Sequence, residues 1–594
     1  MLFNLIFVYL LVYSIGFLTS KLIFKGARLL LRIILSFALG FGILSWVITF
    51  LGFILNFEFL NVILALLTIL IFLFYKTRKI KFKIDFKIDA KFILLVLPFF
   101  LLSFLHILFF PELYRDSMIY AYLTKLFYQR KNIGFIEGGP SIALGFASNY
   151  PSAYQLIGAF TYFFSGENLI SLRLSSFLFS FLLVLLVYCW AKDVFKEEGL
   201  SIYSVLFLIS LPLIIFFSRS ASQYIYLTFQ FSFACFFLYR FLLQKNKSDL
   251  YASAIFAGFA ALSSYLGLLF TFFLLLTFQL GKKFYKSILI SLLLFFLIIS
   301  PWYLRNFVIL GNPIWPFGGG KYIDPLIQAS SLNQLNKISK TAGFNYETPE
   351  DLKNSLIRLF FSFINYHNAS IYHGLNPIFT FLAIPGLFLW LKTKDKKIKF
   401  FILWFLILLA FYLVAVNYWN KYLILISVPT AFLSTYFVGC LQKFEIVKWL
   451  LVFFFGFLYI NSLYLALFWD ECPAGDIDSP KILENFGNHQ KILEACYGSD
   501  AKIWRWVNEN IPENEIIATN DFKLYYYNRT VIELSSWRLR GLLYSNNINE
   551  TVRILKENNV KYLSLIGGLE EMRKYPQHFK LIREVDSRAI YEVI

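Results

Sequence analysis

The sequence predicts an all-α polytopic membrane protein with about fourteen transmembrane helices and a small C-terminal α/β domain outside the membrane. The chain has 594 residues, of which 58% are hydrophobic and only 15% charged. Soluble domains average roughly 45–50% apolar and about 25% charged residues. Apolar runs of about 20 residues, the length that crosses a bilayer, recur along most of the chain. After Asp470 the charge rises and the apolar runs shorten to strand length.

The apolar runs predict fourteen spans, two of which are short. The expected spans are residues 2–20, 30–52, 58–75, 92–110, 170–190, 200–217, 223–243, 250–265, 267–281, 287–302, 375–391, 400–416, 421–438 and 449–468. The first run lacks a basic n-region and a small-residue cleavage site, so we expect it to be a retained span and not a signal peptide.

The basic residues support this count. The formal net charge is +19, and the basic residues cluster in seven short loops between apolar segments. This is the pattern of the positive-inside rule, and it argues against nucleic-acid binding. Fourteen alternating spans place all seven loops in the cytoplasm and both termini outside. The segment 149–166 is too short to span, and we expect it to lie in the interface with Tyr150, Tyr154 and Tyr162 at headgroup level.

Three regions follow from this topology. Residues 1–91 form extra N-terminal helices with a basic cytoplasmic loop, residues 92–469 form the membrane core, and residues 470–594 form the extracytoplasmic α/β domain. The core carries outer loops at 111–169 and 302–374. In the last region, hydrophobic periodicity predicts helices at 501–510 and 547–559, and strands at 514–521, 525–535, 560–568, 579–586 and 588–594.

The first candidate site lies in PELYRDSMIYAYLTK, residues 111–125, directly after a span. If this segment is helical, Glu112, Asp116 and Tyr120 share one face. The two acids could supply a general base and a substrate-orienting group, or hold a divalent cation with the help of waters. Alternatively, Arg115 and Asp116 form an ion pair that only anchors a surface helix. The spacing alone does not decide between these interpretations.

Cations at outer span ends form the second candidate. Arg305 and Asn306 stand in PWYLRNFVILGNPIWPF, where Arg305 could bind a lipid phosphate with two parallel hydrogen bonds or serve as a snorkelling anchor. Three more cations lie at outer span ends, where the positive-inside rule disfavours positive charge. They are Arg173, Arg219 and Lys421, the last beside Tyr422. An anionic lipid headgroup would require several such cations to converge at one depth.

Other motifs are weaker. Cys472 and Cys496 fall in the outer domain, where a disulfide is chemically permitted, but their spacing does not decide whether they pair. His367 and His373 are six residues apart and do not share a helical face, so the spacing favours a loop role near the substrate over a metal site. Nucleotide-loop, zincin and hydrolase-elbow motifs are absent from the sequence.

Five stretches carry a family resemblance. In order they are YRDSMIYAYLTKLF, NYPSAYQLIGAF, SLRLSSFLFSFLLVLLVY, PWYLRNFVILGNPIWPF and NKYLILISVP. Together, over about residues 92–470, they resemble the GT-C superfamily of integral-membrane glycosyltransferases. The likeness is to the protein-mannosyltransferase and aminoarabinose-transferase-like group, which uses polyprenyl-phosphate sugars. The family's RYL arginine is here Lys421, which cannot form a bidentate fork.

The resemblance implies a cavity open to the outer leaflet and transfer of a sugar with inversion. Asp116 would be the general base on the acceptor hydroxyl, and Arg219, Arg305 and Lys421 would hold the donor phosphate. Further substrate contacts are expected from Glu112, Arg115, Tyr120, Asn306 and Tyr422. The donor would be a polyprenyl-phosphate sugar and the acceptor a lipid, glycan or protein. No cofactor is required, although the acids leave room for a divalent cation.

Two other functions remain open at this point. A transporter or flippase of lipid-linked glycans would need ionisable groups at mid-span and often inverted repeats, and the sequence offers neither. A non-catalytic membrane scaffold for cell-surface assembly, with the outer domain as its binding part, fits the sequence as well.

Overall fold

The computed structural model describes most of the membrane core and most of the C-terminal region. The described residues are 2–24, 28–80, 89–135, 149–280, 282–315, 377–391, 396–415, 420–442, 444–468, 472, 484–521, 523–534, 536–543, 545, 547–567 and 569–594. His367, His373 and most of the expected outer loop 302–374 lie outside these ranges.

The membrane core is a bundle of helices, and each of the fourteen expected spans contains helix. The helices of this bundle are α1 (Leu2–Ile23), α2 (Leu29–Ile54), α3 (Phe59–Thr77), α4 (Ala90–Phe109), α8 (Leu169–Phe195), α9 (Glu198–Ile209), α10 (Pro212–Phe217), α11 (Gln223–Gln244), α12 (Lys247–Ala261), α13 (Phe270–Leu276), α14 (Tyr285–Leu310), α17 (Pro377–Leu391), α18 (Lys396–Ala415), α19 (Ser427–Leu441) and α20 (Glu445–Phe468). Within the described residues, nine helices are long and apolar enough to cross a membrane. The protein is therefore a multi-pass membrane protein.

Several of the expected spans are interrupted. The segment 200–217 consists of α9 and α10, which break at Pro212, where proline removes a backbone donor and restricts the preceding residue. The segment 267–281 combines the 3-10 turns η1 (Tyr265–Leu269) and η2 (Thr277–Leu280) with α13 between them. Because of these breaks, neither segment contains, among its described residues, a single helix long enough to cross.

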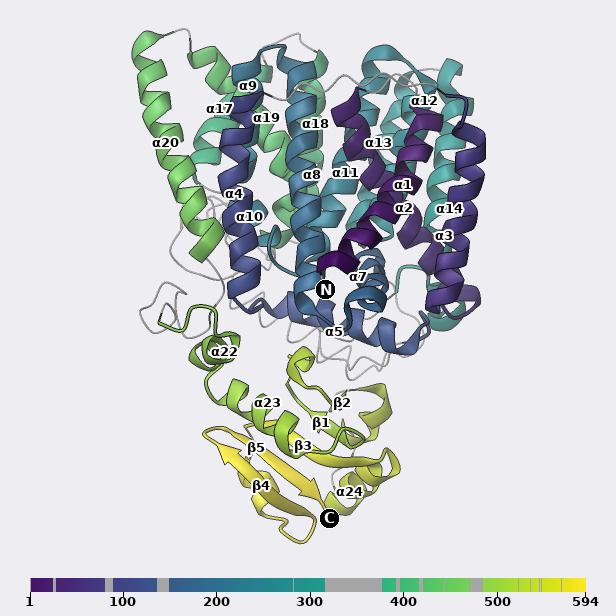
Figure 1. Ribbon diagram of the computed structural model, residues 1–594, viewed down its shortest axis with the longest axis vertical. Coiled ribbons are helices and arrows are strands. Elements are labelled where there is room, and N and C mark those ends of the chain that lie inside the picture. The colour runs from purple at the N-terminus through teal and green to yellow at the C-terminus, as the bar shows by residue number, and fades with distance from the viewer. Residues whose placement is uncertain are drawn as a thin grey trace.

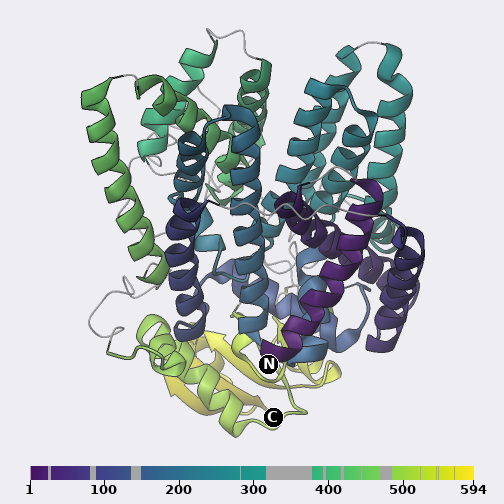
Figure 2. The ribbon, with the colours of Figure 1, turned by 45° about the horizontal axis from the view of Figure 1, so that its top comes forward.

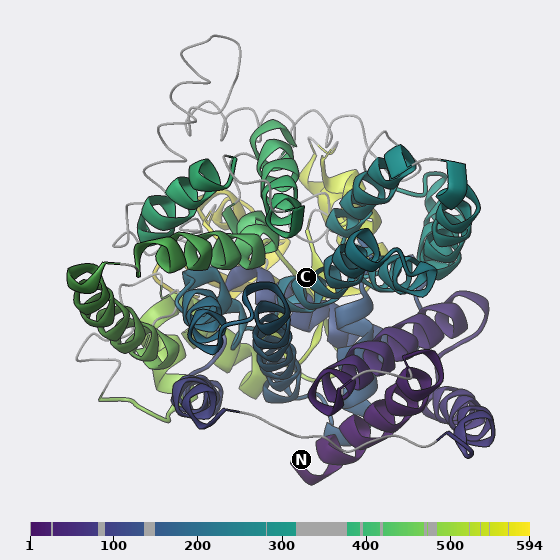
Figure 3. The same cartoon turned by 90° about the horizontal axis from the view of Figure 1, so that it is seen from above.

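The helices form three groups around a centre (Figure 3). Helices α1–α3 gather on one side, α12–α14 on a second and α17–α20 on a third, while α8 and α11 run between them. The two ends of the chain lie at the same end of the bundle (Figure 1). The basic turns α8–α9 and α11–α12 lie at the opposite end.

Two shorter helices cover the lower end of the bundle in Figure 1, and both differ from the sequence expectation. Helix α5 (Arg115–Arg130) starts later than expected, since residues 110–114 form neither helix nor strand. Helix α7 (Ala153–Ser165) is buried within the protein instead of lying in the interface. Tyr154 and Tyr162 are both fully buried, so the expectation of headgroup tyrosines was wrong for these two residues. The wide apolar surface of α7 is covered by neighbouring helices and not by lipid.

The C-terminal domain is a small mixed α/β unit, as the hydrophobic periodicity predicts. Its elements are α22 (His489–Tyr497), α23 (Ser499–Asn510), β1 (Ile516–Thr519), η5 (Leu524–Tyr526), β2 (Thr530–Glu533), α24 (Ile548–Glu557), β3 (Val560–Ile566), α25 (Leu569–Arg573), β4 (Phe579–Val585) and β5 (Arg588–Val593). The strand order is β2-β1-β3-β5-β4, with parallel pairs β1–β2 and β1–β3 and antiparallel pairs β3–β5 and β4–β5. Asn547 caps α24 through its side chain, which accepts a hydrogen bond from Asn549 N.

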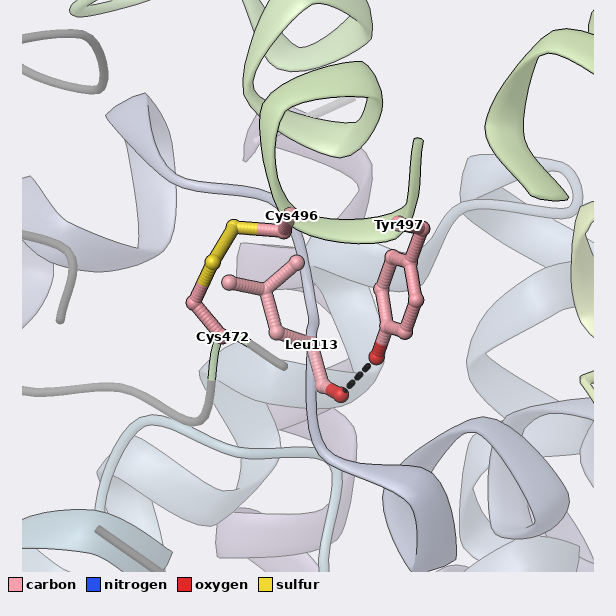
Figure 4. Close-up of a disulfide and its surroundings, with 4 residues drawn as sticks. All are labelled: Leu113, Cys472, Cys496 and Tyr497. Carbon is pink, nitrogen blue, oxygen red and sulfur yellow. Dashed lines mark hydrogen bonds between the residues drawn. A yellow bond between two sulfur atoms is a disulfide. The ribbon is translucent and has the colours of Figure 1, made fainter. Parts of the chain in front are cut away.

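The domain lies across the lower end of the bundle (Figure 2). Cys472, shortly after α20, forms a disulfide with Cys496 in α22, which settles a pairing that the sequence left open. Figure 4 shows this disulfide beside Leu113, in the extended segment that precedes α5. The link ties the first helix of the domain to the bundle near the candidate acids.

Candidate active site

An ion pair between α5 and the 3-10 turn η4 (Asn420–Ile426) forms the centre of the candidate site. Lys421 Nζ donates to Asp116 Oδ2, and Tyr114 OH donates to the same oxygen over 3.0 Å. The Asp116 side chain is 18% exposed while that of Lys421 is only 8% exposed. The carboxylate is thus reachable from outside, and its cationic partner lies behind it. Asp116 also stands in the first turn of α5, where the helix dipole favours negative charge.

Aromatic rings surround the ion pair. Lys421 Nζ lies 5.7 Å from the centre of the Tyr224 ring and 5.5 Å from that of Tyr422, within the range of cation–π attraction. Tyr120 OH donates to Tyr224 OH over 3.1 Å. Burial, and then the charge of Asp116, raise the pKa of Tyr120 well above its usual range, so its phenol stays protonated. The wall of the site therefore presents neutral phenols to anything that approaches the pair.

Glu112 lies in a different environment from Asp116 and has different hydrogen-bond partners. It lies before the helix begins, so the expected common face of Glu112, Asp116 and Tyr120 is wrong for Glu112. Its Oε2 accepts from Ala221 N over 2.8 Å and lies 3.6 Å from Arg173 Nε, and its Oε1 accepts from Tyr114 N. With 1% of its surface exposed, Glu112 fixes the extended segment against the turn before α11.

Arg219, which the resemblance assigned to the donor phosphate, and Arg173, a cation expected at an outer span end, both make backbone contacts. Arg173 Nε donates to the Arg219 carbonyl over 2.7 Å and Arg173 Nη1 to the Phe110 carbonyl over 2.6 Å. Arg219 Nη1 donates to the carbonyls of Leu465 and Ala466 near the end of α20. Cations near a helix C-terminus stabilise its last carbonyls. The two guanidinium groups join α4, α8, α10 and α20 next to the start of α5.

Arg305 and Asn306 hold the other end of α5. Arg305 donates to the carbonyls of Ile133 and Gly134, directly after this helix, and to Asn306 Oδ1 over 2.6 Å. Asn306 Nδ2 donates to Tyr265 OH over 3.0 Å. Arg305 is fully buried. Its predicted contact with a lipid phosphate stays a prediction, and in this structure it fixes the loop after α5.

The structure thus brings Asp116, Tyr120, Lys421 and Tyr422 into one site and places Glu112, Arg219, Arg305 and Asn306 around the ends of α5. Arg115 is the first residue of α5, and its side chain lies outside the described part. Tyr114 and Tyr224 were missed by the sequence analysis. Tyr114 could have been noticed because it precedes Asp116 by two residues, whereas nothing local in the sequence marks Tyr224.

Metal binding by the acids stays a prediction. Among the described residues, no group of three or more His, Cys, Asp or Glu side chains could hold a metal ion. The contacts of Glu112 with Ala221, Tyr114 and Arg173 occupy both of its oxygens.

Comparisons with known proteins point to one fold. Two crystal structures of ArnT from Cupriavidus metallidurans match with 11% identity over 85% of this chain. The apo form has a TM-score of 0.51 over 97% of its chain, and the form bound to undecaprenyl phosphate has 0.52 over 98%. The chain therefore has the same overall fold as these ArnT structures.

The sequence comparisons are narrower. Residues 156–304 match the family described as dolichyl-phosphate-mannose-protein mannosyltransferase. No curated protein sequence matches the chain. The matched residues run from α7 into α14 and contain Arg173 and Arg219, but neither Asp116 nor Lys421. The roles of the ion pair must therefore be argued from its geometry.

Proposed function

We propose that this protein is a GT-C glycosyltransferase that moves a sugar from a polyprenyl-phosphate donor to an acceptor hydroxyl on the extracytoplasmic side. The observation that carries this proposal is the partly exposed Asp116 carboxylate, paired with a buried lysine at the end of a membrane bundle. The family match names a dolichyl-phosphate-linked sugar, and an ArnT structure holds undecaprenyl phosphate. The family match and the ArnT structure both support a lipid-phosphate sugar as the donor of this protein.

The geometry suggests how the reaction proceeds. Asp116 takes the proton of the acceptor hydroxyl while the hydroxyl oxygen forms a bond to the sugar carbon C1. The bond between C1 and the phosphate oxygen breaks, its electron pair stays on the polyprenyl phosphate, and the configuration at C1 inverts. The Lys421 ammonium leaves its ion pair with Asp116 and binds this phosphate, because the departing oxygen carries more negative charge in the transition state. The pairing seen here is therefore the resting arrangement of both groups.

The phenols contribute by positioning. Tyr120 and Tyr224 supply neutral hydroxyl groups beside the ion pair, which can donate hydrogen bonds without adding charge. Tyr422 and Tyr224 shield Lys421 with their rings. Arg219 and Arg305 act in this proposal by holding the bundle around α5. The reaction as proposed needs no cofactor, since the lipid phosphate is itself the leaving group.

The test is sugar transfer by the purified protein in nanodiscs, using a panel of radiolabelled polyprenyl-phosphate sugars. We expect Asp116→Asn to lower the rate by about 10²–10⁴-fold, the usual contribution of a general base. The matched control is Asp249→Asn, which removes a carboxylate paired with Arg240 at 3.6 Å in α12 and should leave transfer unchanged. Full transfer by Asp116→Asn would remove this residue as the base. No turnover with any donor would favour the scaffold function instead.

A further inference from the structure

Residues 108–113 comprise the last two residues of α4 and the first four residues of its connection to α5, and we call this segment the linker. Residues 110–114 form neither helix nor strand, yet Glu112 and Leu113 are each only 1% exposed. Buried backbone carbonyls need a hydrogen-bond donor, and an extended linker cannot supply it from its own backbone. The position of α5 therefore depends on where those donors come from.

Arg173 of α8 supplies the donor for the Phe110 carbonyl, and the C-terminal domain supplies donors for three other carbonyls. Tyr497 OH donates to the Leu113 carbonyl (Figure 4) and Tyr526 OH donates to the Glu112 carbonyl. His489 Nε2 lies 3.0 Å from the Leu108 carbonyl. Burial lowers the pKa of His489, so its imidazole is neutral near pH 7 and this nitrogen can donate its proton. Three side chains of one domain thus reach the same six-residue linker.

These donors are themselves held rigidly. Trp504 is 3% exposed and packs against the rings of Tyr526 and Tyr497, at 4.8 Å and 5.4 Å between ring centres. Its Nε1 donates to Asp521 Oδ2 over 2.9 Å. The disulfide of Cys496, the neighbour of Tyr497, links α22 to Cys472, four residues after the end of α20. Both tyrosine hydroxyls are therefore fixed relative to the bundle.

We propose that the C-terminal domain positions Asp116 for catalysis through its hydrogen bonds to the linker 108–113, with Tyr497 and Tyr526 as positioning residues. This inference rests on the proposed function of Asp116 as the base. Leu113 stands three residues before Asp116 and α5 starts at Arg115, so a shift of the linker moves the carboxylate directly. A displacement of about 1 Å at a reacting group can lower a rate about 100-fold.

The experiment compares tyrosine-to-phenylalanine variants, which keep the ring packing and remove only the hydroxyl. We expect Tyr497→Phe and Tyr526→Phe each to lower kcat about 3- to 10-fold, as the loss of one hydrogen bond predicts, with KM for the donor unchanged. The matched control is Tyr122→Phe, which removes the hydrogen bond from Tyr122 OH to the Val531 carbonyl at the same interface without touching the linker. The control should keep its kcat.

A double-mutant cycle separates positioning from general stability. In the Asp116→Asn background the two tyrosine changes should lower the residual rate no further, because they act through a carboxylate that is already absent. The positioning role would be overturned if the tyrosine changes lowered the rate of Asp116→Asn by the same factor as they lower that of the unaltered protein. It would also be overturned if Tyr497→Phe and Tyr526→Phe had the same kcat as Tyr122→Phe. Full activity of Asp116→Asn alone would instead overturn the proposed function, so the two failures are distinguishable.

Discussion

At the scale of single residues, the site depends on two donors that reach one carboxylate oxygen from different parts of the chain. Tyr114 precedes Asp116 by two residues, whereas Lys421 follows it by 305. The sequence marked Asp116 and Lys421 as separate candidates because each charge stands at a span end. It could not show that they meet, since side-chain contacts across hundreds of residues leave no local periodicity.

The charge of Lys421 is testable by two substitutions of similar length. Lys421→Met should lower transfer about 10²–10³-fold, the usual loss when one donor to a developing anion is removed. Lys421→Arg should retain more activity, because it keeps the charge. The same lipid-linked transfer assay measures both variants.

A lysine elsewhere in the bundle provides the control. Lys192→Met breaks the 2.8 Å pair with Glu198 at the end of α8 and should leave the rate unchanged. Equal transfer by Lys421→Met and the unaltered protein would show that Lys421 does not assist the leaving group.

At the scale of elements, hydrophobic length and periodicity predicted the helices and strands well. All five C-terminal strands lie within the predicted ranges and Asn547 caps α24, but β2 covers only part of the strand predicted at 525–535, whose first residues belong to η5. Two elements near the site differ: the start of α5 and the burial of α7. Local pattern fails there because packing decides both, through the contacts of Glu112 and through the helices that cover α7.

The contact between α1 and α2 offers an element-scale prediction. A Cβ atom at Gly16 would lie 1.7 Å from the Ser36 carbonyl oxygen, and one at Gly40 would lie 2.1 Å from the Val12 carbonyl oxygen. Small residues let membrane helices approach this closely. We therefore expect Gly16→Ala to destabilise the protein by about 1–3 kcal/mol, the usual effect of overpacking. Thermal unfolding in one detergent measures the change.

Gly456→Ala is the matched control in a different span. A Cβ atom at Gly456 would meet nothing within 4 Å, and alanine favours a helix by about 1 kcal/mol over glycine. This variant should unfold at the same or a higher temperature. If Gly16→Ala behaved in the same way, the close approach of α1 and α2 would not contribute to stability.

At the scale of the whole molecule, the soluble domain and the basic turns lie at opposite ends of the bundle (Figure 1). The α8–α9 turn carries Lys196 and the α11–α12 turn carries Lys245 and Lys247. Short basic loops stay in the cytoplasm, so the candidate site beneath the soluble domain should face outward. Charge placement in the sequence predicts this orientation in the membrane, because the orientation depends on the alternation of spans and not on how the spans pack.

Cysteine labelling in intact cells tests this orientation. Lys580 in β4 and Lys247 at the start of α12 are both exposed, and each can be replaced by cysteine. We expect a membrane-impermeant maleimide to label Lys580→Cys in intact cells and Lys247→Cys only after permeabilisation. The unaltered protein gives the background from Cys189, Cys235 and Cys440, which are buried or half-buried. The reverse pattern would place Asp116 on the cytoplasmic side, where a donor and acceptor outside the membrane could not reach it.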